Sequence, residues 1–122
     1  MRACVLVVSD QPDNLDLYYD LLESDKYELE LSNYTFENLE TIVRLSPTLI
    51  ILDFPAHDPT KGWALLRQLK MDPTTSSIPL ILCAPFLNDV WEQEDNLQEQ
   101  GIVIFYKPLS PKAFVQTVYQ MM

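Results

Sequence analysis

In "LIILDF", residues 49–54, four aliphatic side chains precede one carboxylate, Asp53, and this pattern is the strongest indication of the fold. An apolar run without polar alternation is typical of a strand buried on both faces, as in a parallel sheet covered by helices. In such open sheets, ligands bind beyond the carboxyl ends of the strands. Asp53 is therefore either a rim residue that ends a strand or the centre of a binding site.

Apolar runs and amphipathic stretches alternate along the whole chain, which predicts five strand–helix pairs. The expected strands cover residues 4–10, 27–32, 48–54, 78–85 and 102–108, and the expected helices cover residues 11–24, 35–45, 61–72, 88–101 and 110–122. Residues 27–32 alternate strictly between apolar and polar side chains, so we expect an edge strand there. The sequence predicts one α/β domain over residues 1–122, with a parallel sheet and helices on both faces.

The predicted helices carry apolar residues at helical spacing, which we expect on the side that faces the sheet. These residues are Leu15, Leu17, Leu21, Leu22, Phe36, Leu39, Ile42, Val43, Trp63, Leu65, Leu66, Leu69, Val90 and Leu97. Ser110 and Pro111 predict the start of the last helix, as its N-cap and first helical residue.

Charge and composition narrow the class of partner. The formal net charge of −10 argues against direct binding to nucleic acid or to anionic membranes, and it suits a basic partner or a cation. No window is apolar enough to span a bilayer, and the N-terminus lacks the features of a signal peptide. We therefore expect a cytoplasmic protein.

The positions of the glycines and cysteines argue against the usual nucleotide enzymes and against a cysteine metal site. The only glycines are Gly62 and Gly101, so the glycine-rich loops that cradle phosphates in the usual nucleotide enzymes are absent. Cys4 and Cys83 lie within apolar runs and lack the spacing of metal ligands, which indicates buried free thiols.

Polar residues follow three of the expected strands, in "VSDQP" after the first, "LDF" in the third and "YKP" in the fifth. With their spacing, these motifs resemble the receiver domains of two-component response regulators, and the resemblance covers the whole chain. It implies the flavodoxin-like strand order 2-1-3-4-5, with Asp10 and Asp53 at the ends of adjacent strands. It also implies a signalling switch rather than an enzyme.

The resemblance assigns a role to each of these residues. Asp53 is expected to be the phosphoacceptor for a histidine kinase or a phosphotransfer protein, and Lys107 is expected to contact the phosphoryl group. Mg²⁺ is the expected cofactor, with Asp10, Asp53 and the backbone carbonyl of Pro55 as its ligands. The Lys107–Pro108 bond is often cis in this family.

The sequence departs from the family pattern at three places. Ser9 stands where the family has a second acid, and an alternative role for it is to cap the turn into the first helix. The hydroxyl residue expected after the fourth strand is replaced by Ala84, or by Cys83 if the register shifts by one. The aromatic residue of the fifth strand has no clear counterpart, since Ile104 occupies its usual distance from Lys107.

Receivers commonly pair or signal through their fourth helix, fifth strand and fifth helix. We expect this surface, over residues 88–122, to bind an output protein or a second copy of the chain. Trp91 lies either exposed on it or folded back against the sheet. Two other functions stay open: a pseudo-receiver that binds partners without phosphorylation, and a small flavodoxin-like cofactor binder.

Overall fold

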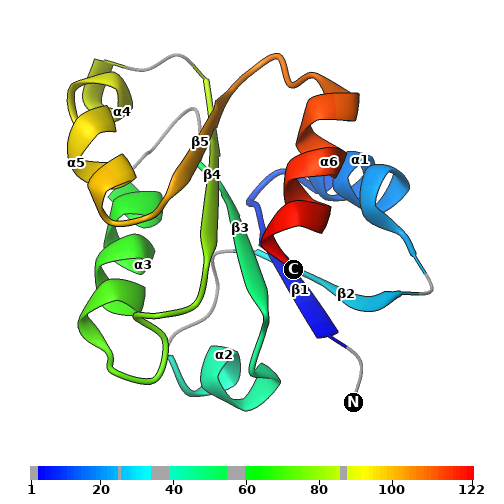
Figure 1. Ribbon diagram of the computed structural model, residues 1–122, viewed down its shortest axis with the longest axis horizontal. Coiled ribbons are helices and arrows are strands. Elements are labelled where there is room, and N and C mark those ends of the chain that lie inside the picture. Colours follow the sequence, from blue (N-terminus) through cyan, green and yellow to red (C-terminus); the bar gives the residue numbers. More distant parts are fainter. Residues whose placement is uncertain (1–2, 25, 34–38, 55–59, 86–87) are drawn as a thin grey trace.

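The structure is a computed structural model that describes residues 3–24, 26–33, 39–54, 60–85 and 88–122. Its five parallel strands form one sheet in the order β2-β1-β3-β4-β5, which confirms the predicted flavodoxin-like order (Figure 1). The strands are β1 (Ala3–Val8), β2 (Tyr27–Ser32), β3 (Leu49–Asp53), β4 (Leu80–Ala84) and β5 (Val103–Tyr106). The helices are α1 (Pro12–Leu22), α2 (Glu40–Leu45), α3 (Thr60–Met71), α4 (Asn88–Glu92), α5 (Glu94–Glu99) and α6 (Pro111–Met121).

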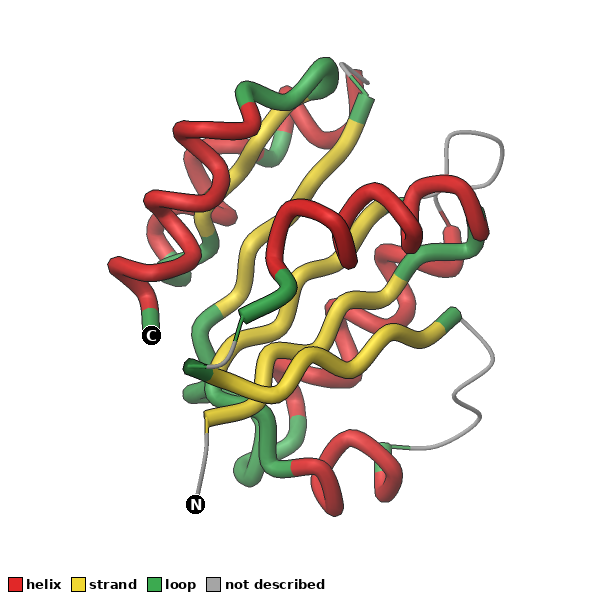
Figure 2. The backbone as a smooth tube through the Cα atoms, turned by 90° about the vertical axis from the view of Figure 1, so that its right-hand side faces the viewer, coloured by secondary structure: helices red, strands yellow, loops and turns green. Residues whose placement is uncertain are grey.

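Helices cover both faces of the sheet, as Figures 1 and 2 show from two directions. On one face, β-strand side chains pack with buried residues of α1 and α6, such as Tyr18 and Phe114. On the other face they pack with buried residues of α2, α3, α4 and α5, such as Ile42 and Leu69. Strand β3 lies between these two cores and is buried along its whole length, as its unbroken apolar run predicts.

The expected fourth helix is divided in two by Gln93, whose φ of −95° and ψ of 4° lie outside the helical range. Val90 on α4 and Leu97 on α5 are both buried, so the predicted inner face is confirmed on either side of the break. Edge strand β2 alternates between buried or half-buried and exposed side chains up to Glu30, also as predicted.

Most of the predicted inward-facing residues are buried or half-buried, but two predictions are wrong. Leu17 is 49% exposed and Val43 is 38% exposed. On α1 the buried position next to Leu17 belongs to Tyr18, which is 1% exposed. Phe36 lies outside the described residues. The apolar pattern of α1 thus concealed a buried polar group, the Tyr18 hydroxyl.

A glycine sets how closely α3 approaches the end of β3. A Cβ atom added to Gly62 would lie 2.7 Å from the ring of Phe54, the residue that follows Asp53. Real Cβ atoms do not approach other atoms so closely, so glycine allows this ring to pack between the strand and the helix.

Candidate functional site

Asp53 is the last residue of β3 and lies at the carboxyl edge of the sheet. Side chains alternate along a strand, so Asp53 shares the face of Leu49 and Ile51, which is covered by α1 and α6. Its register partner on β4 is Cys83. Asp53 is only 1% exposed, so its carboxylate needs partners from the protein itself.

Lys107 is the charged partner of this carboxylate. Its Nζ lies 2.5 Å from Asp53 Oδ1, and its side chain is 29% exposed, whereas that of Asp53 is 2% exposed. The backbone N–H of Lys107 donates to Ala84 O at 2.8 Å, which fixes the residue just beyond β5. The Lys107–Pro108 bond is cis. Two of the residues selected from the sequence are therefore in direct contact.

Three neutral donors among the described residues also contact Asp53. Ser9 Oγ and Asn14 Nδ2 donate to Oδ2 at 2.7 and 2.9 Å, and the Tyr18 hydroxyl donates to Oδ1 at 3.0 Å. Counting Lys107, each carboxylate oxygen thus has at least two donors among the described residues. Asn14 and Tyr18 were not selected from the sequence. Their spacing of four residues on α1, which puts both on one helix face, is the signal that was available.

Ser9 replaces the second acid of the family pattern with a hydrogen-bond donor. It is fully buried and donates to Asp53, as described above. Its Oγ also accepts from the backbone N–H of Gln11 at 3.2 Å, which confirms the predicted role at the turn into α1. A carboxylate at this position would repel Asp53 unless a cation lay between them. The hydroxyl of Ser9 instead stabilises the negative charge of Asp53.

Asp10 follows Ser9 and is half-buried. Its Oδ1 is buried without a hydrogen-bond partner, and no other side-chain oxygen or nitrogen of the described residues shares this condition. Such an atom is a candidate ligand for an ion. Among the residues that the structure describes, no three His, Cys, Asp or Glu side chains gather in a group that could hold a metal. Pro55, the third expected ligand, lies outside the described residues.

The end of β4 presents no hydroxyl to this site. Cys83 and Ala84 are both fully buried. Burial raises the pKa of the Cys83 thiol to about 12, with an opposing contribution from a hydrogen bond with Tyr18. Burial also raises the pKa of the Tyr18 hydroxyl, as do its neighbours Cys83 and Asp53. Both groups therefore keep their protons at neutral pH, and Tyr18 acts toward Asp53 as a donor.

The aromatic residues of β5 point in different directions. Phe105 packs edge-to-face on Phe114 of α6, with ring centroids 5.5 Å apart. Tyr106 packs against the opposite core, and its hydroxyl donates to Glu94 Oε1 of α5 at 3.2 Å. Tyr106 therefore links β5 to α5, and Ile104 packs within the same core.

A cavity of about 250 Å³ adjoins the site between α1 and the segment after β5. Asn14, Tyr18 and Lys107 line it, but Asp53 is not among the lining residues. The donors thus separate the carboxylate from this opening.

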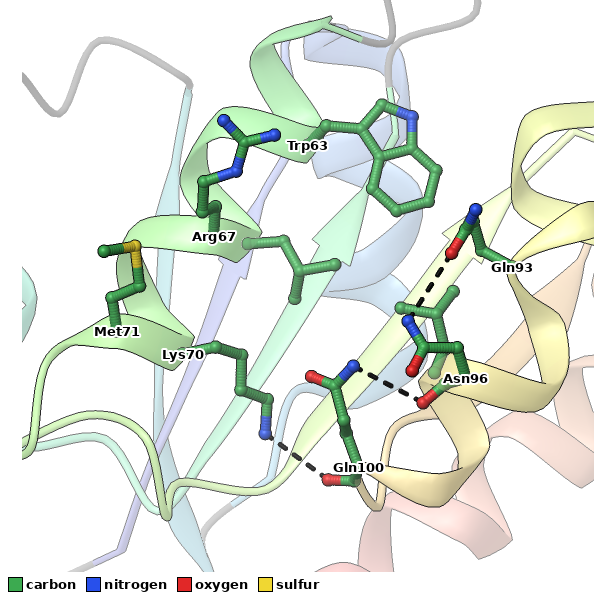
Figure 3. A pocket seen from close by; sticks show the side chains of 9 residues that line it. Trp63, Arg67, Lys70, Met71, Gln93, Asn96 and Gln100 are labelled. Atoms are coloured by element: carbon green, nitrogen blue, oxygen red, sulfur yellow. Dashed lines mark hydrogen bonds between the residues drawn. The ribbon is translucent and has the colours of Figure 1, made fainter.

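A second cavity of about 250 Å³ lies between α3 and α5 (Figure 3). Arg67 and Lys70 line one side, and the amides of Gln93, Asn96 and Gln100 line the other. Lys70 donates to Gln100 O at 3.5 Å across the cavity. No acid lines it. It is therefore separate from the carboxylate site.

The chain is similar to known proteins over almost its whole length. No protein-family model matches the chain. The chain is 27% identical to the polar-differentiation response regulator DivK from Brucella abortus over 119 residues, which cover 97% of this chain and 94% of DivK. No helix among the described residues is long and apolar enough to cross a membrane.

Solved structures of receiver domains and response regulators are also similar to this chain. The signal receiver domain of a signal transduction histidine kinase from Syntrophus aciditrophicus is 26% identical, with a TM-score of 0.78 over 98% of this chain and 89% of that chain. The chemotaxis response regulator CheY4 of Vibrio cholerae shares the fold, with a TM-score of 0.76 over all of both chains and 19% identity. In sequence and in fold, the chain fits a response regulator receiver domain of two-component signalling.

Proposed function

We propose that residues 1–122 form one receiver domain that accepts a phosphoryl group on Asp53 from a histidine kinase or a phosphotransfer protein. The contact of 2.5 Å between Lys107 Nζ and Asp53 Oδ1 carries this proposal, because it places a cation at the carboxylate expected to react. Phosphoryl transfer depends mostly on positioning and on neutralisation of charge. In the transfer, a carboxylate oxygen forms a bond to phosphorus while the bond between phosphorus and the donor's nitrogen breaks. Lys107 is placed to hold the phosphoryl oxygens.

Mg²⁺ is the metal that we propose for this site. Asp10 would hold it through the buried Oδ1 that has no partner, and Asp53 would contribute one oxygen after a donor leaves it. The backbone carbonyl of Pro55 is the third proposed ligand. This small set suits an ion that keeps several of its ligands as water. When bound, Mg²⁺ neutralises charge on the phosphoryl oxygens.

Output through protein–protein contact is the second part of the proposal. Trp91 on α4 is 55% exposed, which fits the exposed orientation rather than one folded back against the sheet. Exposed tryptophans are enriched among the residues that dominate binding energy at interfaces. We propose that α4, α5, β5 and α6 present the surface for an output protein or a second copy. The charge of −10 favours a basic protein surface and opposes direct contact with nucleic acid.

Intact-mass spectrometry after incubation with acetyl phosphate and Mg²⁺ tests the proposal. We expect one phosphoryl adduct on the wild-type chain, none on Asp53→Asn, and a strong decrease when EDTA removes the metal. An adduct that persists on Asp53→Asn would place the acceptor elsewhere. A folded wild-type chain that takes no phosphoryl group from acetyl phosphate or from a kinase would contradict the proposal.

One observation favours a pseudo-receiver as the second candidate. Four donors among the described residues already contact Asp53, so the carboxylate is satisfied without a metal or a phosphoryl group. In that case Asp53 stabilises the fold, and partner binding is independent of phosphorylation. The adduct experiment separates the two candidates, because only the first predicts a covalent product.

A further inference from the structure

We infer that Tyr18 is a positioning residue that holds Asp53 in a closed arrangement and so slows phosphoryl transfer to it. The inference rests on the proposed function, because it concerns the rate at which Asp53 reacts. It starts from the hydroxyl of Tyr18, which donates to Asp53 Oδ1 at 3.0 Å, the same oxygen that Lys107 contacts.

The number of donors limits the reactivity of the carboxylate. An ionised carboxylate has about four sites for accepting hydrogen bonds. Ser9 and Asn14 fill two sites on Oδ2, and Tyr18 and Lys107 fill two on Oδ1. An oxygen that attacks phosphorus must direct a lone pair at it. At least one donor therefore has to leave Asp53 before the bond to phosphorus forms.

Tyr18 is the buried neutral donor on Oδ1, the oxygen that Lys107 also contacts, whereas Asn14 is half-buried and donates to Oδ2. Lys107 supplies charge that the transfer itself uses, and Ser9 also holds the turn into α1. Tyr18 is 1% exposed, and its ring packs on Phe114 with centroids 5.7 Å apart, so the hydroxyl is fixed in place. It also has no positive charge with which to stabilise a phosphoryl group.

Tyr18 further shields the carboxylate from the neighbouring cavity. Its side chain lines that cavity together with Asn14 and Lys107, whereas Asp53 does not line it. A small phosphodonor that enters by this route meets the donors before it meets the acceptor. Removal of the hydroxyl alone therefore frees a lone pair and keeps the packing of the ring.

The first test is the rate of adduct formation with acetyl phosphate and Mg²⁺. We expect Tyr18→Phe to raise the maximal rate about tenfold, the factor that corresponds to one lost hydrogen bond to a charged group, with little change in the concentration of acetyl phosphate at half-maximal rate. Tyr19→Phe is the matched control, because Tyr19 is the next residue on α1 and is 44% exposed. We expect it to react like the wild type.

The second test measures the strength of the contact between Tyr18 and Asp53, and it needs no phosphodonor. A double-mutant cycle combines Tyr18→Phe with Asp53→Ala and follows unfolding in urea. We expect the two substitutions to be coupled by about tenfold in the unfolding equilibrium constant, and Tyr19→Phe to show no coupling with Asp53→Ala.

The two tests together separate the possible failures. Coupling with a faster Tyr18→Phe reaction supports the inference. Absence of coupling overturns the contact, and coupling with an unchanged or slower reaction overturns the effect on rate. Coupling without an adduct on either protein overturns the proposed function and the rate effect with it, and leaves Asp53 as a structural carboxylate.

Discussion

The edge of the sheet has two parts that differ sharply in polarity. Around Asp53, side chains from the segment after β1, from α1 and from the segment after β5 converge on one carboxylate and supply four donors among the described residues. At the adjacent end of β4, Cys83 and Ala84 are buried and present no hydroxyl to the site. The first part contains groups that hold a negative charge. The second lacks the group that, in the receivers this chain resembles, contacts the phosphoryl group and transmits its presence.

We expect the polar part to govern phosphoryl transfer to Asp53, and the end of β4 to govern the conformational response to it. A modification shifts a conformational equilibrium only through contacts that differ between the two states. Ala84, at the end of β4 and in the core shared with α4 and α5, has no hydroxyl with which to make such a contact. We therefore expect a site that accepts a phosphoryl group and transmits its effect poorly by this route.

The largest expected effect comes from removal of the charged partner in the polar part. Lys107→Met leaves the buried Asp53 without its cation and should lower the free energy of unfolding by about 3 kcal/mol. Urea denaturation followed by circular dichroism measures this loss. Lys112→Met on α6 is the control, because Lys112 is exposed. Equal stability of the two variants would show that Lys107 does not stabilise the carboxylate.

The next prediction concerns Ser9, which stands where the family pattern has an acid. Ser9→Asp places a second carboxylate against Asp53 and should lower the free energy of unfolding by about 2 kcal/mol in EDTA, through repulsion of like charges. Mg²⁺ should restore most of this loss. Ser9→Asn, which adds no charge, serves as the control and should not respond to Mg²⁺. A Ser9→Asp variant that is equally stable with and without Mg²⁺ would contradict the metal site.

Apolar runs that end in a polar or charged residue predicted the strands, whereas the strand order and the pair Asp53 and Lys107 were expected from the resemblance to receiver domains. The sequence did not reveal Tyr18. On α1, helical spacing from Leu22 was compatible with a buried Tyr18, but only the packing against Phe114 shows that this side chain is buried while Leu17 is exposed. The break at Gln93 was also missed, because the acidic stretch on both sides of it has one continuous helical pattern.

The thiol at the end of β4 predicts a smaller, pH-dependent effect. The folded state raises the pKa of Cys83 from 9.0 to about 12, so the folded chain retains a proton that the unfolded chain loses. The contribution of this thiol to stability should therefore be constant well below pH 9 and fall as the pH rises toward 12. By pH 10 this group should account for a loss of about 1.4 kcal/mol.

Urea denaturation at pH 8 and pH 10 measures this loss. Cys83→Ala is the comparison, and it should lose less stability between the two values because the titrating thiol is absent. An equal loss in both proteins would assign the pH dependence to other groups, such as Tyr18.

The smallest expected effect comes from restoring a hydroxyl at the apolar part. Ala84→Thr adds one donor beside the phosphoryl group, a contact of about 1 kcal/mol that exists only in the phosphorylated state. Hydrogen exchange of α4 and α5 should then change more on phosphorylation than it does in the wild type. Ala84→Val has a similar shape without the hydroxyl and is the matched control. An equal response in both variants would mean that shape, not the hydroxyl, sets the coupling.

We expect the acceptor side of the site to react, while the β4 side does not transmit the reaction to the rest of the domain. Amide NMR spectra of the chain before and after treatment with acetyl phosphate and Mg²⁺ test both parts of this expectation. We expect large shifts for Ser9, Asn14, Tyr18, Asp53 and Lys107, with small shifts in α4 and α5. Spectra without change at Asp53, or large shifts that extend through α4 and α5, would contradict it.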